Sequence, residues 1–261
     1  MASFNDKKDK EVALDAPPPG YEEAAPSAAS SGFVSTSELQ INALGYDTNQ
    51  ALTGKMLENI TVYRVDSGQP EYISVRQKAS SNSCALVKAS DPGQNTLIST
   101  IYRWGPGRHP KMHLLPYDST VSVEQAIEND NIAGEEVKVV SRKWYSRDQV
   151  FHTSLGEFTW TYGDRDEKAE LDADSLLVMK RADGSKDGVQ VAQLIRNDDL
   201  RTAGSKRYSG GNGGRLVMDL RKWQGEKTAG PGIEAFVVAS CILMLKREAD
   251  RFINNNIAAV S

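Results

Sequence analysis

The pattern of apolar and polar positions divides the chain into three parts. Residues 1–50 are rich in Ala, Ser, Pro and Glu and hold few large apolar side chains. Such a segment cannot bury enough surface to offset the entropy lost on ordering, so we expect a disordered tail. From about Leu52 onward, short runs of β-branched and aromatic residues alternate with turn residues, and residues 235–245 are apolar at every position except Ser240.

Ten runs in the middle part predict β-strands, and the turns between them are typical of a β-sandwich or β-barrel. Asp183-Gly184 between two of the runs is a hairpin signal. Residues 121–129 are the one ambiguous run, which we interpret as a helical insertion. The ten runs are residues 57–65, 71–76, 84–88, 96–104, 137–144, 149–153, 157–162, 175–181, 189–196 and 214–220.

The apolar run near the C-terminus predicts a buried helix. It has no polar face at the helical period, so protein or lipid must surround it. Residues 233–245 would rise only about 20 Å as a helix, which is short of the roughly 20 residues that a bilayer span needs. We therefore expect a central helix at about residues 232–250 within a folded domain of residues 51–250, and a short C-terminal tail at residues 251–261.

Charge and cysteine content narrow the class of protein. The net charge is −4, and after the acidic residues 1–50 the chain holds 28 basic and 27 acidic residues. This balance lacks the basic excess of a nucleic-acid-binding surface, so no nucleic-acid partner is expected. Two cysteines, Cys84 and Cys241, make a disulfide framework improbable. The first ten residues lack the apolar region of a secretory signal. We expect a cytoplasmic protein, peripheral at membranes.

A partner-binding motif lies in the tail. Pro18, Pro19, Gly20 and Tyr21 form Pro-Pro-x-Tyr, which WW domains bind because the prolines already hold a polyproline II conformation. HECT-type ubiquitin ligases are the commonest readers, so we expect Pro18, Pro19 and Tyr21 to recruit such a WW-domain protein. The alternative is a chance match within a Pro/Ala/Ser-rich tail.

The Pro-Pro-x-Tyr tail, about a dozen strands and a wholly apolar helix ending in Lys246-Arg247 together resemble the tubby C-terminal-like superfamily. This group includes tubby, the LURP-one-related proteins and the phospholipid scramblases, and the chain is most similar to its small fungal branch. The resemblance spans about residues 52–250. It implies a mainly β fold in which a closed barrel of roughly 12 strands surrounds a hydrophobic C-terminal helix. The Cys-rich and calcium-binding stretches of scramblases have no counterpart here.

Two copies of Arg-Lys-Trp are candidate lipid contacts. Cations beside a tryptophan suit an anionic headgroup at a membrane interface. The simpler interpretation is strand alternation, in which Trp points into the core and Lys into water. The candidate anionic-lipid-binding residues are Arg142, Lys143, Arg221 and Lys222.

Other motifs do not support catalysis or metal binding. His109 and His113 have the spacing of a helical zinc pair, but Pro110 opposes a helix and a third ligand is missing. The glycine-rich residues 209–214 lack the Lys-Ser/Thr ending of a phosphate loop, so we interpret them as a flexible connection. We expect no catalytic residues, no metal and no cofactor.

The expected function is therefore that of a non-enzymatic binding or adaptor protein. The barrel would associate with membrane phospholipid, and the tail would recruit the WW-domain protein. Two alternatives stay open. One is a scramblase-like lipid transporter whose C-terminal helix enters the bilayer. The other is a small-molecule-binding barrel, which is disfavoured because the helix would fill the lumen.

Overall fold

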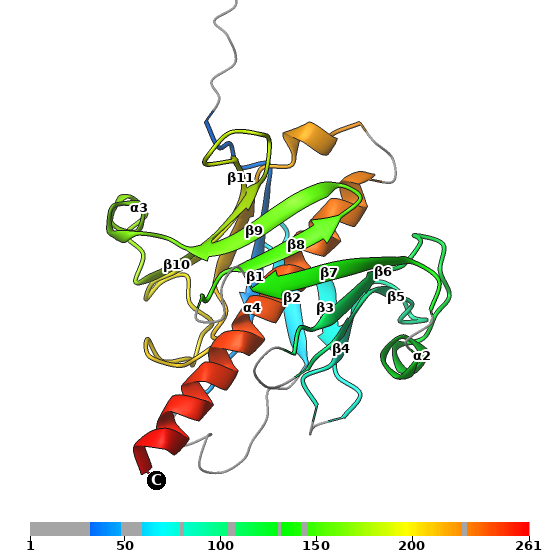
Figure 1. Ribbon diagram of the computed structural model, residues 1–261, viewed down its shortest axis with the longest axis horizontal. Coiled ribbons are helices and arrows are strands. Elements are labelled where there is room, and N and C mark those ends of the chain that lie inside the picture. The colour runs from blue at the N-terminus through cyan, green and yellow to red at the C-terminus, as the bar shows by residue number, and fades with distance from the viewer. Residues whose placement is uncertain are drawn as a thin grey trace, which may run out of the picture. The chain divides into compact units, whose positions relative to one another are not determined.

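A computed structural model describes residues 32–47, 59–78, 81–103, 108–129, 132–141, 146–225 and 229–260. Among these residues, twelve antiparallel strands close into a barrel within the compact unit Phe33–Ser261 (Figure 1). Each strand pairs with the next along the chain, and β1 pairs with both β2 and β12 to complete the ring. The prediction of a mainly β chain with a closed barrel of about 12 strands is confirmed.

Ten of these strands overlap the ten predicted runs, with ends that differ by a few residues, and the helical insertion is confirmed as α2. The strands are β1 (Ser37–Asn42), β2 (Ile60–Arg64), β3 (Pro70–Val75), β4 (Cys84–Lys88), β5 (Thr96–Ile101), β6 (Lys111–Leu114), β7 (Glu135–Ser141), β8 (Gln149–Thr153), β9 (Gly156–Tyr162), β10 (Ser175–Arg181), β11 (Val189–Arg196) and β12 (Arg215–Met218). The helices are α2 (Val123–Glu128), α3 (Arg165–Glu170), the 3-10 helix η1 (Arg221–Trp223) and α4 (Ala229–Val260).

The predicted boundary between a disordered tail at residues 1–50 and a folded domain from residue 51 is wrong, because β1 lies before it. Leu39 and Ile41 of β1 are fully buried. Side chains alternate between the two faces of a strand, so these two residues are enough to place one face of β1 in the core. The folded unit therefore begins before Leu52, and residues 1–31 lie outside the described residues.

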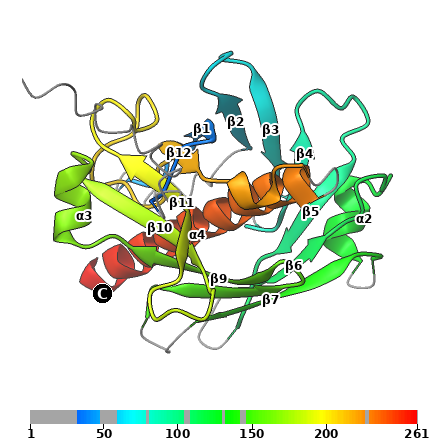
Figure 2. The same cartoon turned by 90° about the horizontal axis from the view of Figure 1, so that it is seen from above.

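The buried C-terminal helix is confirmed as α4, which runs through the ring of strands (Figures 1 and 2). Every residue from Ile233 to Lys246 is buried. The helix is longer than predicted, because it begins at Ala229 and ends at Val260. The predicted tail at residues 251–261 is therefore helical as far as Val260. Searched over the described residues, no helix combines the length and the apolarity that crossing a membrane requires.

The one polar side chain in the apolar run has a partner inside the barrel. The indole Nε1 of Trp160 on β9 donates to the Ser240 Oγ at 2.9 Å, and that hydroxyl donates to the Val237 carbonyl at 3.0 Å. Nearby, the rings of Phe151 and Phe158 pack against Phe236 with centroids 5.9 and 5.3 Å apart. Aromatic contacts of this kind fill the space between helix and sheet, so the protein itself surrounds the apolar helix.

Residues 209–214 are a packed part of the barrel rather than the flexible connection that the sequence predicts. Gly211 has a φ of +78°, and a Cβ added there would lie 2.3 Å from the Leu245 carbonyl oxygen of α4. Asn212 is buried, and its Nδ2 donates to the Lys206 carbonyl at 3.1 Å. Glycine is needed here because only a residue without a side chain permits this backbone conformation and this approach to the helix.

Candidate functional site

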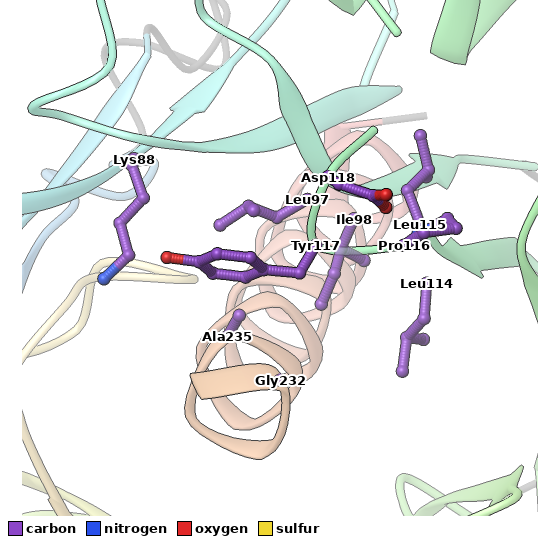
Figure 3. Close-up of a pocket in the computed structure, with 10 residues that line it drawn as sticks. All are labelled: Lys88, Leu97, Ile98, Leu114, Leu115, Pro116, Tyr117, Asp118, Gly232 and Ala235. Atoms are coloured by element: carbon purple, nitrogen blue, oxygen red, sulfur yellow. The ribbon is translucent and has the colours of Figure 1, made fainter. Parts of the chain in front are cut away.

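A pocket of about 550 Å³ opens at the rim of the barrel beside the first turns of α4 (Figure 3). Its volume lies within the range of roughly 300–1,000 Å³ that is typical of small-molecule sites. The walls come from β4, β5, β6, the segment after β6 and the start of α4. The lining residues are Lys88, Leu97, Ile98, Leu114, Leu115, Pro116, Tyr117, Asp118, Gly232 and Ala235.

Small residues at the start of α4 leave the space for this pocket. A Cβ added at Gly232 would meet no atom within 4 Å, and Ala235 contributes only a methyl group. On the sheet side, Ile98 of β5 pairs with Leu114 of β6, so apolar side chains from two neighbouring strands line the same hollow. The result is an apolar cavity, which favours an apolar ligand because burying apolar surface is the main driving force for such binding.

Tyr117 partly covers the pocket. Figure 3 shows its ring lying across the start of α4, with the hydroxyl directed to the side on which Lys88 lies. The Tyr117 side chain is 71% exposed, and no other described residue hydrogen-bonds its hydroxyl. A tyrosine in this position offers an apolar ring to a ligand and a polar group at the pocket mouth.

Lys88 belongs to a charge network between the sheet and the helix. Its Nζ is paired with the Glu71 carboxylate and lies 4.4 Å from the centroid of the Tyr72 ring. Glu71 also accepts from Arg64 Nε at 3.2 Å, and Arg64 forms a second ion pair with Glu234 of α4. Burial would raise the pKa of Glu71, but Lys88 and Arg64 together hold it below its ordinary value. Two cations and two carboxylates therefore balance each other beside the pocket.

Tyr72 completes this network as a neutral donor. Its hydroxyl donates to a Glu234 oxygen at 2.9 Å, and the other Glu234 oxygen accepts from Ser37 Oγ at 2.9 Å. Burial, followed by the Glu234 carboxylate, raises the pKa of Tyr72 above its ordinary value. These bonds tie the start of α4 to β1, β2 and β3 and fix the helix wall of the pocket.

The predicted lipid-binding residues Arg221 and Lys222 do not line the pocket. They are exposed on η1, so the expectation of a strand at this position is wrong. Arg221 pairs with Asp219 at 2.6 Å, and Lys222 Nζ lies 5.9 Å from the Trp223 ring centroid. Trp223 itself is buried and packs against Phe158 with centroids 6.2 Å apart. The tryptophan therefore points into the core, as the simpler interpretation expects.

Five predicted site residues lie outside the described residues. They are the WW-binding residues and the first Arg-Lys pair: Pro18, Pro19, Tyr21, Arg142 and Lys143.

The two histidines of the His109–His113 pair lie in different environments. His113 lies on strand β6 and is buried, with its Nε2 3.7 Å from a Glu136 oxygen, whereas His109 precedes the strand and is exposed. In the part of the chain that the structure describes, no group of three or more His, Cys, Asp or Glu residues is placed to hold a metal ion.

The sequence did not reveal the pocket, because its walls come from separate segments between residues 88 and 235. The one local signal is Pro116-Tyr117, an exposed proline and tyrosine directly after an apolar strand end. Comparison of the chain with protein-family models, with curated proteins and with solved structures finds no match in any of the three. Function therefore has to be inferred from the pocket and from the tail motif.

Proposed function

We propose that this chain is a non-enzymatic adaptor whose barrel binds a membrane lipid and whose tail recruits a WW-domain protein such as a HECT-type ubiquitin ligase. The observation that carries the proposal is the apolar pocket at the barrel rim, with Tyr117 at its mouth. The protein would act in the cytoplasm, peripherally at a membrane.

Lipid binding would be driven by the apolar surface of the ligand that the pocket buries. Each methylene group taken out of water contributes about 0.8 kcal/mol. About eight methylenes would therefore contribute roughly 6 kcal/mol, against which the loss of ligand freedom must be set. The closed barrel around α4 is also the fold that a resemblance to the tubby C-terminal-like superfamily implies, and that resemblance supports a membrane lipid as the ligand.

Flotation with liposomes tests the lipid half. We expect the full-length chain to float with phosphatidylcholine vesicles, and a Gly232→Leu variant, whose side chain would enter the pocket, to remain in the aqueous fraction. An Arg221→Ala/Lys222→Ala variant, compared on vesicles with and without phosphoinositide, measures any contribution from anionic headgroups. Equal flotation of the Gly232→Leu variant would contradict lipid binding in the pocket.

The tail half is tested by pull-down with an isolated WW domain. The tyrosine of the motif fills a pocket of its own in such domains, so Tyr21→Ala should abolish capture of the full-length chain. Undiminished capture of that variant would remove this half of the proposal.

A small-molecule-binding barrel is the second candidate, and the same pocket volume favours it. Binding of a soluble ligand by a chain that does not float would identify this alternative.

A further inference from the structure

We infer that the rim pocket selects an uncharged amphiphile, with an apolar chain ending in a hydroxyl or ester oxygen, over a fatty acid of the same chain length. This inference rests on the proposed function, because it names the ligand class of the same site.

The charges at the pocket disfavour a ligand that carries a carboxylate. Among the described lining residues, Lys88 is the only cation, and its amino group is already paired with Glu71. Asp118 supplies a further carboxylate, and no described residue forms an ion pair with it. The two cations and two carboxylates of the neighbouring network already balance each other. An entering carboxylate would therefore bring an uncompensated charge into a site that already holds the Asp118 carboxylate. Like charges at close range repel, and an unpaired charge is costly to remove from water.

Two side chains at the pocket can form hydrogen bonds with an uncharged polar group of a ligand. The Tyr117 hydroxyl has no partner among the described residues, and it can both donate and accept. An ammonium group has three N–H donors, and one of those on Lys88 is directed to Glu71. Both polar groups lie at the same side of the pocket in Figure 3. A hydroxyl or ester oxygen can therefore be bound without bringing a new charge into the site.

Competition between two ligands of equal chain length tests the inference. The purified full-length chain is loaded with N-phenyl-1-naphthylamine, an uncharged fluorescent dye, and then titrated with 1-monopalmitoylglycerol or with palmitate below their aggregation limits. We expect the monoacylglycerol to displace the dye at a concentration about tenfold lower, since one missing charge pair corresponds to roughly that factor. Displacement by palmitate at an equal or lower concentration would overturn the inference.

Three variants place the effect in the pocket. Gly232→Leu should abolish dye binding, whereas Gly32→Leu, a matched control whose added Cβ also meets no atom within 4 Å, should retain it. Tyr117→Phe should weaken the monoacylglycerol by about three- to tenfold, the equivalent of one hydrogen bond, and change palmitate less.

Asp118→Lys reverses one exposed charge and should shift the preference toward palmitate, while Glu170→Lys on α3 should not. An unshifted preference in Asp118→Lys would also overturn the inference. If palmitate is preferred while the wild-type chain still floats with vesicles, the selectivity fails and the proposed lipid binding stands. If the wild-type chain neither floats nor binds the dye, the proposed lipid binding fails as well.

Discussion

The two ends of α4 differ in how the barrel meets them. At the start, the helix borders a hollow, and the small residues Gly232 and Ala235 face space that no side chain fills. The start is joined to the sheet by the Arg64–Glu234 ion pair. Toward the other end, which we call the closed end, the sheet holds the helix through a further set of buried polar contacts. Arg196 of β11 binds Glu248 at 2.6 Å, and the Tyr162 hydroxyl donates to the same carboxylate at 2.9 Å.

At the closed end, α4 carries charged side chains at positions where a purely apolar core would have Leu or Val. Lys246 is fully buried, and its Nζ donates to the Asn82 carbonyl at 2.7 Å. Asp250 accepts from Asn82 Nδ2 at 3.1 Å and from the Tyr102 hydroxyl. Burying a charge is tolerated where a partner is buried with it. Ion pairs therefore fix the helix at both ends, Arg64–Glu234 at the start and Arg196–Glu248 further along, and the start also borders the apolar pocket.

Breaking the buried ion pair should have the largest effect on stability. In Glu248→Gln, Arg196 would keep its charge in a site where its side chain is only 4% exposed, and loss of one partner of a buried pair costs about 3–5 kcal/mol. Urea denaturation measures this change in the free energy of unfolding. The matched control is Glu128→Gln in the exposed Lys78–Glu128 pair, where we expect a change within about 0.5 kcal/mol. Similar losses in both variants would contradict the proposed role of the closed end.

The same substitution at both ends should act in opposite directions. In Gly211→Ala, the new Cβ would lie 2.3 Å from the Leu245 carbonyl oxygen at a positive φ, so we expect a loss of about 2–3 kcal/mol. In Gly232→Ala, the Cβ would enter open space, and the higher helix propensity of alanine should add up to about 1 kcal/mol. Thermal unfolding of the two variants checks both signs. A loss of stability in Gly232→Ala would show that this end is less open than described.

Deprotonation of the buried Lys246 should contribute an increase in the free energy of unfolding as the pH is raised. Burial lowers the pKa of Lys246 below its ordinary value. Between the folded and the unfolded pKa, the unfolded chain binds more protons, so stability rises with pH up to the unfolded value of about 10.4, by at most about 1.4 kcal/mol per pH unit. The buried Cys241 thiol, whose pKa burial raises, acts in the opposite direction in the same range. Denaturation curves between about pH 8 and pH 10 should therefore show a more positive slope of stability against pH in the wild type than in Lys246→Met, since both proteins contain Cys241.

The buried tyrosines do not act in the same window. Burial raises the pKa of Tyr72, Tyr102 and Tyr162. The stability they contribute is therefore present below the unfolded value of about 10 and is lost above it. Parallel curves for the wild type and Lys246→Met would contradict the assignment to Lys246.

The sequence predicted those parts of the fold that a local apolar pattern encodes. The helix was identified because residues 235–245 lack a polar face, and ten strands were identified from β-branched and aromatic runs. β1 was missed because it lies within residues 1–50, whose overall composition is rich in Ala, Ser, Pro and Glu. β6 was missed because it has only four residues, two of which are Lys111 and His113. The helix end was misplaced because Glu248 and Asp250 look solvent-exposed until their partners on the sheet are known.

The candidate site could not be predicted in the same way. Its lining residues are separated by long stretches of sequence, and its volume depends on the lack of a side chain at Gly232. The charge network beside it joins Arg64, Glu71 and Glu234 across the sheet and the helix. Neither property has a local pattern, because both arise only when the barrel has closed.

The closure between β1 and β12 has a consequence for the order in which this protein is made. Ser37 of β1 pairs with Met218, and its hydroxyl binds Glu234, a residue 197 positions later in the chain. During synthesis at roughly 5–20 residues per second, β1 therefore leaves the ribosome about ten seconds or more before its last partners exist. Until α4 follows, the inner face of the sheet has no helix to cover it. Contacts of such long sequence separation also slow folding after release, so the inner face of the sheet stays exposed to aggregation until α4 has been made and has docked.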